Sequence, residues 1–338
     1  MAEAGRLAHD QGDPDQTEAL HEAALAIWRS LGDRRGESRS LDELGNVAHD
    51  RGDFSRAVAL HEQALALVRE AGDRRSTGRS LNNLAMVALY QSQDERAWQL
   101  YSEALALLRE VGDAYGVNVV LNNLGIVAIR RGELDQAESI SNECLAGCRD
   151  LGDQQGIGNA LVNLAEVAQC RGNRTRAAAL YEEARQLLQD LGDDRSTAEA
   201  CYGLATLAFV GGDDARAASL FGTCLALSHH VDDKMIVAGA LEGLAGAATR
   251  QDEAERAGQL LGAAAALRDR IEAPVAAHRR ASHAGIVAAT RAGLDTATFT
   301  AAWESGQAWP LEQAVAEAMV LAEVLAEAPS YGPMVEVM

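Results

Sequence analysis

Proline and aromatic residues are scarce in this chain of 338 residues, which has five prolines and only 4% Phe, Trp and Tyr. Runs of β-branched residues are almost absent as well. An α/β or all-β enzyme of this length would show such turn and strand signals. Ala, Leu and Gly dominate instead, a composition that suits thin, repeated helix packing. The sequence therefore predicts an all-α protein.

Basic residues are outnumbered, with 30 Lys and Arg against 50 Asp and Glu, and the formal net charge is -20. Phosphate binding depends on clustered Lys and Arg, so this chain is a poor partner for nucleic acid. No stretch approaches the ~18 consecutive apolar residues of a membrane span, and the N-terminus lacks a basic segment followed by an apolar core. We expect a cytoplasmic protein without nucleic-acid or membrane partners.

The cysteines and histidines do not predict a metal site. The cysteines form no CxxC pair and no paired disulfide spacing, which favours a reducing compartment. Cys144 and Cys148 share a helix face, but no histidine stands at ligand spacing, so we interpret them as small core residues. The pair His49–Asp50 also occurs forty residues earlier, as His9–Asp10, so it reflects an internal sequence repeat and does not indicate a metal site. We expect neither a metal nor a cofactor.

Catalytic motifs are missing too. The chain contains no GxxxxGK[ST] phosphate loop, no GxGxxG, no HExxH and no GxSxG nucleophile elbow. The GGDD sequence contains Gly212 and Asp213, which match Gly52 and Asp53 at a multiple of forty residues, so we interpret it as a turn of an internal repeat. We therefore expect that the protein is not an enzyme, and the enzyme hypothesis rests only on scattered His and Asp residues.

Glycine recurs with a strict period of forty residues. One register is followed each time by Asp: Gly32, Gly72, Gly112, Gly152 and Gly192. A second register lies midway: Gly52, Gly132, Gly172 and Gly212. Glycine can take the left-handed conformation that closes a helix, and the following Asp can accept hydrogen bonds from the first free amides of the next helix. Each forty-residue unit is therefore predicted to be a helical hairpin.

Each predicted hairpin carries the same order of large and small side chains. In one unit this order is Leu81, Leu84, Ala85, Ala88, Ala97, Tyr101 and Ala104. Over residues 37–276 the pattern resembles the tetratricopeptide repeat, with Leu in place of the usual leading Trp and a longer second helix in place of the late Pro. The resemblance implies a right-handed superhelical stack of antiparallel helical hairpins, an α-solenoid with C-terminal capping helices.

The forty-residue form has LNNLG or LNNLA in its first helix. It resembles the repeats of kinesin light chains and Pins-type spindle-orientation adaptors, which bind peptides. It also resembles the C-terminal solenoids of bacterial LuxR-type and related signal-transduction ATPases. The resemblance implies a regulatory module that binds a protein or peptide, or a small regulatory ligand, in its concave groove.

We expect three parts in the chain: a truncated repeat over 1–36, six repeats over 37–276, and a degenerate repeat with a C-terminal cap over 277–338. Met1 aligns with Leu41, so the chain starts inside a helix. We therefore expect the natural gene to continue upstream, or Met1 to be an artificial boundary.

The C-terminal part keeps the forty-residue phase at Gly285, Ala288 and Ala297. This phase predicts a degenerate hairpin, followed by a helix from Leu311 to Ala328 that caps the stack. Trp303 and Trp309 are expected to seal its last open face.

The first helix of each hairpin is expected on the concave side, where residues not used in packing form a binding surface. The candidate groove residues are Arg79, Asn82, Asn83, Met86, Leu89, Tyr90, Asn122, Asn123, Ile126, Arg130, Asn159, Asn163 and Glu166. Asn83, Asn123 and Asn163 form a ladder whose carboxamides can donate to and accept from a peptide backbone. Alternatively, these amides satisfy neighbouring carbonyls or side chains.

Two functions use the same groove. The first is a free-standing adaptor that binds a partner's peptide or helix. The second is the sensor arm of a larger bacterial regulator, in which binding to the solenoid releases an attached ATPase or DNA-binding domain.

Overall fold

The computed structural model describes residues 14–327, and within this range the chain is helical and contains no β-strand. The all-α prediction is confirmed. The chain divides into two compact units, Met1–Gly152 and Asp153–Met338. The expected repeat alignment of residues 1–13 lies outside the described residues. The expected boundaries at residues 36 and 276 stay predictions.

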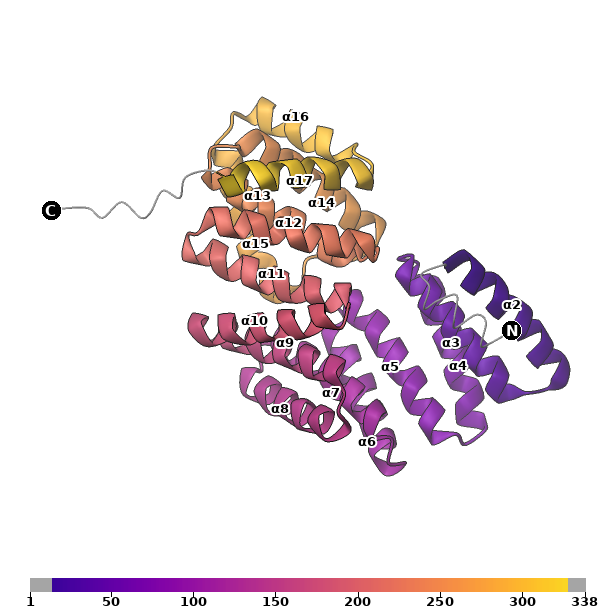
Figure 1. The fold of residues 1–338 in the computed structure, drawn as a ribbon. Helices are drawn as coiled ribbons and strands as arrows, with labels where there is room; N and C mark the ends of the chain where they lie inside the picture. The colour runs from indigo at the N-terminus through magenta and orange to yellow at the C-terminus, as the bar shows by residue number, and fades with distance from the viewer. Residues whose placement is uncertain (1–13, 328–338) are drawn as a thin grey trace. The chain divides into compact units, whose positions relative to one another are not determined.

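Unit 1 is a series of helical hairpins (Figure 1). Its described helices are α2 (Pro14–Leu31), α3 (Arg34–Asp50), α4 (Phe54–Glu70), α5 (Arg74–Tyr90), α6 (Asp94–Glu110), α7 (Ala114–Arg130) and α8 (Leu134–Leu151). α3 pairs with α4, α5 with α6 and α7 with α8, and each hairpin packs against the next. In addition, α5 touches both α3 and α7, so the first helices form one layer, the first-helix layer of unit 1.

Unit 2 continues the same pattern and then departs from it. Its described elements are α9 (Gln154–Cys170), α10 (Arg174–Asp190), α11 (Asp194–Gly211), α12 (Asp214–His230), α13 (Lys234–Arg250), α14 (Ala254–Arg270), η1 (Ala277–Arg279), α15 (Arg280–Ala292), α16 (Thr296–Gln307) and α17 (Leu311–Glu327). α9, α11 and α13 pack side by side and form the first-helix layer of unit 2.

The turns form as the glycine registers predict. All nine glycines of the two registers have φ between 66° and 83°. Where a register lacks glycine, another residue takes the left-handed conformation: Ser92, Asp232, Asp252 and Glu272. The following Asp caps the next helix, as at Asp33, whose Oδ1 accepts hydrogen bonds from the Arg35 and Gly36 amides at 3.1 and 3.0 Å. One dipeptide thus ends one helix and begins the next.

Small residues in the first helices make room for rings from the second helices. A Cβ at Gly45 would lie 2.6 Å from the His61 ring, and a Cβ at Gly203 would lie 2.3 Å from the Tyr181 ring. Both rings are buried. Because protein interiors are close-packed, this alternation of small and bulky residues fixes how the hairpins fit together.

The predicted C-terminal hairpin over α15 and α16 is wrong, because these helices scarcely touch each other. α16 packs along α14 instead, and α15 packs on α13 and α14. Gly285 and Ala288 keep the repeat phase, yet both are exposed. α15 is held by other residues: Thr290 and Thr249 share a hydrogen bond at 2.7 Å between their hydroxyl oxygens.

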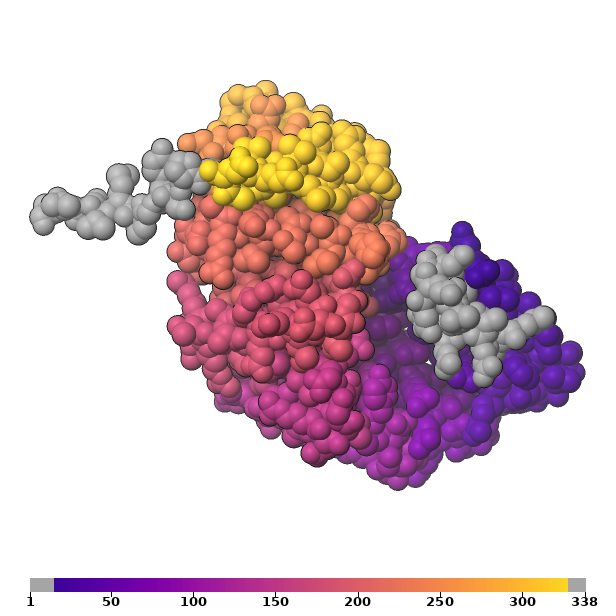
Figure 2. Space-filling view, in the orientation of Figure 1, coloured from indigo at the N-terminus to yellow at the C-terminus, as the bar shows by residue number. Residues whose placement is uncertain are grey.

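The last helix packs against the side of unit 2. α17 contacts α12 along its length and also touches α13 and α14, and Figure 2 shows α17 (yellow) directly beside α12. Leu321 and Leu325 of α17 are buried. Trp303 is half-buried beside Phe299, with 5.8 Å between the ring centroids, and Trp309 is also half-buried.

Candidate functional site

The first-helix layer of unit 1 carries a connected set of carboxamides. Asn123 on α7 donates through Nδ2 to Oδ1 of Asn82 on α5 at 3.1 Å. Asn82 in turn donates to Oδ1 of Asn83 at 3.3 Å. The amides therefore pair diagonally between neighbouring first helices, as the alternative interpretation of the sequence expected. All three side chains are only half-buried, and each amide has more hydrogen-bonding capacity than these bonds use.

Charged residues border these amides. Arg79 is exposed and donates through Nη2 to Oδ2 of Asp113 at 3.1 Å. The Nε atom of Arg130 lies 2.8 Å from Oδ1 of Asp94, and Nη2 of Arg130 donates to Oγ of Ser92 at 3.1 Å. Both predicted groove arginines are thus oriented by their own partners, which limits their freedom to swing toward a ligand.

Apolar and aromatic groups complete the surface. Tyr90 packs edge-on against His49, with 4.5 Å between ring centroids. Met86 on α5 is half-buried, and so are Asn122 and Ile126 on α7. Leu89, by contrast, is 6% exposed and packs in the hydrophobic core, so it belongs to the core and not to the groove surface.

On α9 of unit 2 the predicted residues have different environments. Asn163 is only 3% exposed, unlike Asn83 and Asn123, so the predicted ladder of equivalent amides does not continue as an exposed feature. The Oδ1 atom of Asn159 is buried and accepts no hydrogen bond. Glu166 contacts residues far away in the sequence, His278 and Arg279, and this contact could not be read from repeat periodicity.

Glu166 lies beside two basic side chains of a distant segment. Its Oε1 lies 3.3 Å from Nη2 of Arg279 and 3.6 Å from Nε2 of His278. The Arg279 guanidinium also lies over the Tyr202 ring, 4.7 Å from its centroid. Burial alone would raise the pKa of Glu166, but the His278 contact and the charge of Arg279 outweigh it and lower the pKa to about 2. Glu166 is therefore ionised at neutral pH.

Two further glutamates stand on the same layer, and sequence reasoning did not select them. Glu199 on α11 has its pKa raised to about 7, mainly because burial disfavours its charge. Glu242 on α13 is 7% exposed, and its carboxylate receives Nε and Nη2 of Arg268 at 2.6 and 3.0 Å. His283 Nε2 lies 3.6 Å from Glu242 Oε1. A glutamate thus stands on each of the three helices of the first-helix layer of unit 2, and each is buried or half-buried.

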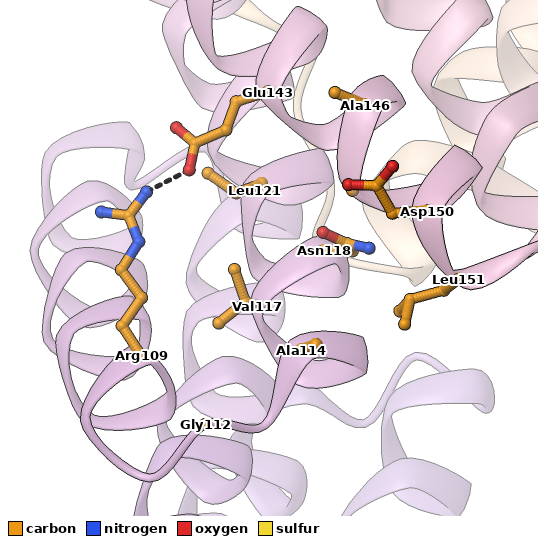
Figure 3. A pocket seen from close by; sticks show the side chains of 11 residues that line it. Arg109, Gly112, Ala114, Val117, Asn118, Leu121, Glu143, Ala146, Asp150 and Leu151 are labelled. Atoms are coloured by element: carbon orange, nitrogen blue, oxygen red, sulfur yellow. Dashed lines mark hydrogen bonds and ion pairs between the residues drawn. The ribbon is translucent and has the colours of Figure 1, made fainter.

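Unit 1 also contains a cleft of about 490 Å³ between α6, α7 and α8 (Figure 3). Its lining residues are Arg109, Gly112, Ala114, Val117, Asn118, Leu121, Glu143, Ala146, Gly147, Asp150 and Leu151. Arg109 donates to Glu143 across one side of the cleft. Asn118 is 6% exposed, and its buried Nδ2 has no hydrogen-bond partner.

Asn118 fits beside this cleft because its neighbours are smaller than in other hairpins. The three equivalent positions of the α5–α6 hairpin are Gly78, Leu107 and Leu108, and here they are Asn118, Gly147 and Cys148. A Cβ at Gly147 would lie 2.3 Å from Oδ1 of Asn118. The larger residue at one position and the smaller ones at the other two therefore compensate each other.

We expect Gly147→Leu alone to lower the free energy of unfolding by about 1–3 kcal/mol, because the new side chain forces Asn118 out of its buried position. Combining it with Asn118→Gly restores two of the three residue types of the α5–α6 hairpin, with Cys148 left unchanged, and should remove most of that loss. Urea unfolding of the two single variants and the double variant measures the coupling. Simple addition of the two single effects would contradict this explanation.

Neither a metal centre nor a bilayer-spanning helix is found in residues 14–327. No cluster of three or more His, Cys, Asp or Glu in this part of the chain could hold a metal ion. None of the described helices has both the length and the apolar character of a membrane span. The five cysteines form no disulfide bond, and Cys144 and Cys148 are buried, as the sequence predicted.

A family model for the tetratricopeptide repeat matches residues 1–70, 43–110, 76–150 and 116–190. These overlapping matches cover more than half of the 338 residues. The chain belongs to the tetratricopeptide repeat family. A comparison with curated protein sequences gave no match.

Similar solved structures include two Rap proteins. One is complexed with competence and sporulation factor: the TM-score is 0.63 at 13% identity, over 96% of this chain and 97% of that chain. The other is the Rap conjugation gene regulator of plasmid pLS20 in complex with the Phr* peptide. Its TM-score is 0.60 at 15% identity, and the match covers 88% of this chain and 77% of that chain. At these identities the likeness shows a shared fold.

A third similar structure is a signal transduction ATPase with numerous domains from Pyrococcus horikoshii, which has a tetratricopeptide repeat sensor. The TM-score is 0.51 at 16% identity, and the match covers 96% of this chain but 52% of that protein. This chain thus spans about half the length of that ATPase.

Proposed function

We propose that this protein is a non-catalytic regulatory scaffold that binds an extended peptide along the first-helix layer of unit 1. The observation that carries the proposal is the amide set of Asn82, Asn83 and Asn123, which is half-buried and linked between α5 and α7. Carboxamides both donate and accept, so they suit recognition of a peptide backbone. Family membership and the peptide-bound Rap structures support this proposal.

The surrounding residues define how such a peptide would be held. Met86 and Ile126 offer apolar contacts beside the amides. Arg79 is the most accessible cation of the set and can meet a carboxylate of the ligand. Because its present partner is the Asp113 carboxylate, a ligand carboxylate would have to compete with that ion pair.

Asn83→Ala combined with Asn123→Ala should weaken a captured peptide by about 1–3 kcal/mol, because backbone hydrogen bonds to the ligand are lost. The partner is first captured from native lysate and identified by mass spectrometry, and a synthetic peptide from it is titrated by calorimetry. Circular dichroism should show unchanged helix content.

Asn142→Ala is the matched control. Asn142 lies on α8, is exposed and donates to the Glu138 carbonyl oxygen at 2.8 Å, outside the first-helix layer. This variant should bind as tightly as the unmodified protein. If the variant lacking Asn83 and Asn123 binds the peptide with unchanged affinity, the peptide binds at another surface and the proposed site is wrong.

A second candidate function is the sensor arm of a larger cytoplasmic regulator. It is favoured by the match of nearly the whole chain to a structure that contains a tetratricopeptide repeat sensor. The gene sequence upstream of Met1 decides between the two: a phosphate loop and a winged helix there would establish the sensor arm, and a stop codon would exclude it.

A further inference from the structure

A segment from the C-terminal part of unit 2 lies over that unit's own first-helix layer. It runs from the end of α14 through η1 into α15, and residues 274–276 within it are neither helix nor strand. His278 and Arg279 reach Glu166 on α9, and Arg279 also reaches Tyr202 on α11. Further along, His283 approaches Glu242 on α13 at 3.6 Å. One segment thus contacts all three helices of the layer.

The contacted residues stand at the repeat positions of the proposed groove. Glu166 is equivalent to Met86 and Ile126, while Tyr202 and Glu242 are equivalent to Asn82. The segment therefore occupies, in unit 2, the surface that unit 1 presents with its amides.

The contacts join carboxylates to basic side chains. The layer contributes the carboxylates of Glu166 and Glu242, and the segment contributes His278, Arg279 and His283. The Arg279 guanidinium is held by a carboxylate on one side and an aromatic face on the other, which is a general way to recognise arginine. We infer that Glu166 and Tyr202 form a binding site for an arginine-bearing peptide, and that Arg279 occupies this site as an intramolecular ligand.

The geometry allows exchange with a competing peptide. The Arg279 side chain is 44% exposed and that of Glu166 is 20% exposed, so solvent and ligands reach the pair. Such partly exposed ion pairs are individually weak. The segment is also held near the site because α15, which follows it, packs on α13 and α14, so the contact is intramolecular. An arginine-bearing partner that binds more tightly displaces it.

This inference deepens the proposed function by naming the ligand class for the first-helix layer of unit 2. Its test needs no identified partner, because the probe is a labelled synthetic peptide with the sequence of residues 274–283. Binding to the full chain is followed by fluorescence anisotropy. Failure here leaves the result for Asn83 and Asn123 in unit 1 untouched, so the two proposals can be separated.

His278→Ala combined with Arg279→Ala should vacate the site and strengthen binding of the probe at least tenfold relative to the unmodified chain. Adding Glu166→Lys should abolish this gain, and a probe carrying Ala in place of Arg279 should not bind. Arg280→Ala is the matched control, since Arg280 donates to the Val275 carbonyl oxygen at 3.1 Å and makes no contact with Glu166. It should bind the probe as weakly as the unmodified chain.

Hydrogen exchange provides a second measurement in the same variants. In the variant lacking His278 and Arg279, backbone amides of residues 275–283 should exchange faster, while those of α9 and α11 keep their protection. The inference is overturned if probe binding is no tighter in that variant, if Glu166→Lys has no effect, or if exchange of the segment is unchanged.

Discussion

Arg268→Leu should lower the free energy of unfolding by about 3–5 kcal/mol, because it leaves a carboxylate buried without its main partner. Glu242 receives two hydrogen bonds from Arg268, at 2.6 and 3.0 Å, and the two side chains are 10% and 13% exposed. The remaining neighbour, His283, is 3.6 Å from the carboxylate and cannot replace a bidentate guanidinium. Chemical denaturation of the full chain measures the loss.

The α9–α10 hairpin supplies the matched control for this prediction. There the two equivalent positions are Val162 and Leu188, which are both buried. Glu242→Val together with Arg268→Leu copies that apolar pair and should come within about 1 kcal/mol of the original stability or exceed it. If the double variant is as unstable as Arg268→Leu alone, an uncompensated carboxylate is not the cause of the loss.

Gly306→Ala should detach α16 from α14 and destabilise unit 2 by about 3 kcal/mol or more. A Cβ at Gly306 would lie 1.8 Å from the Gln259 carbonyl oxygen, and a Cβ at Gly262 would lie 2.1 Å from the Trp303 carbonyl oxygen. Both obstacles are backbone atoms, so only a movement of one helix against the other relieves the clash. Thermal unfolding and hydrogen exchange of α16 measure the effect.

Gly285→Ala serves as the control because it makes the same chemical change in the neighbouring helix α15. A Cβ at Gly285 has no atom within 4 Å, and the residue is exposed. The substitution should therefore stabilise the protein slightly, by up to ~1 kcal/mol, through the better helix propensity of alanine. Equal loss of stability from Gly306→Ala and Gly285→Ala would contradict the role assigned to the close crossing.

The regular part of the fold was predictable because each of its rules is local. A glycine that closes a helix and an aspartate that caps the next one act within a few residues, as at Gly32 and Asp33. The arrangement of α15 and α16 was not predictable in this way. Gly285 keeps the forty-residue phase, but this phase does not show which helix packs against which. The close crossing at Gly306 favours packing of α16 on α14 instead of on α15.

The contacts among the candidate site residues could not be predicted from the sequence. Periodicity places Asn82, Asn83 and Asn123 on one layer, yet it cannot show that Asn123 bonds diagonally to Asn82. The contact between Glu166 and Arg279 joins residues 113 apart in the sequence. No pattern with a period of forty residues contains that information, so this part of the surface required coordinates.

The position of α17 affects how unit 2 folds. Repeat arrays normally contact only their sequence neighbours, so their ends can fray one hairpin at a time. In unit 2, α17 returns to α12 and α13, and Gln251 donates to the carbonyl oxygen of Leu325, 74 residues later, at 3.5 Å. Such long-range closure slows folding, and it makes α12, α13 and α17 open as one cooperative block.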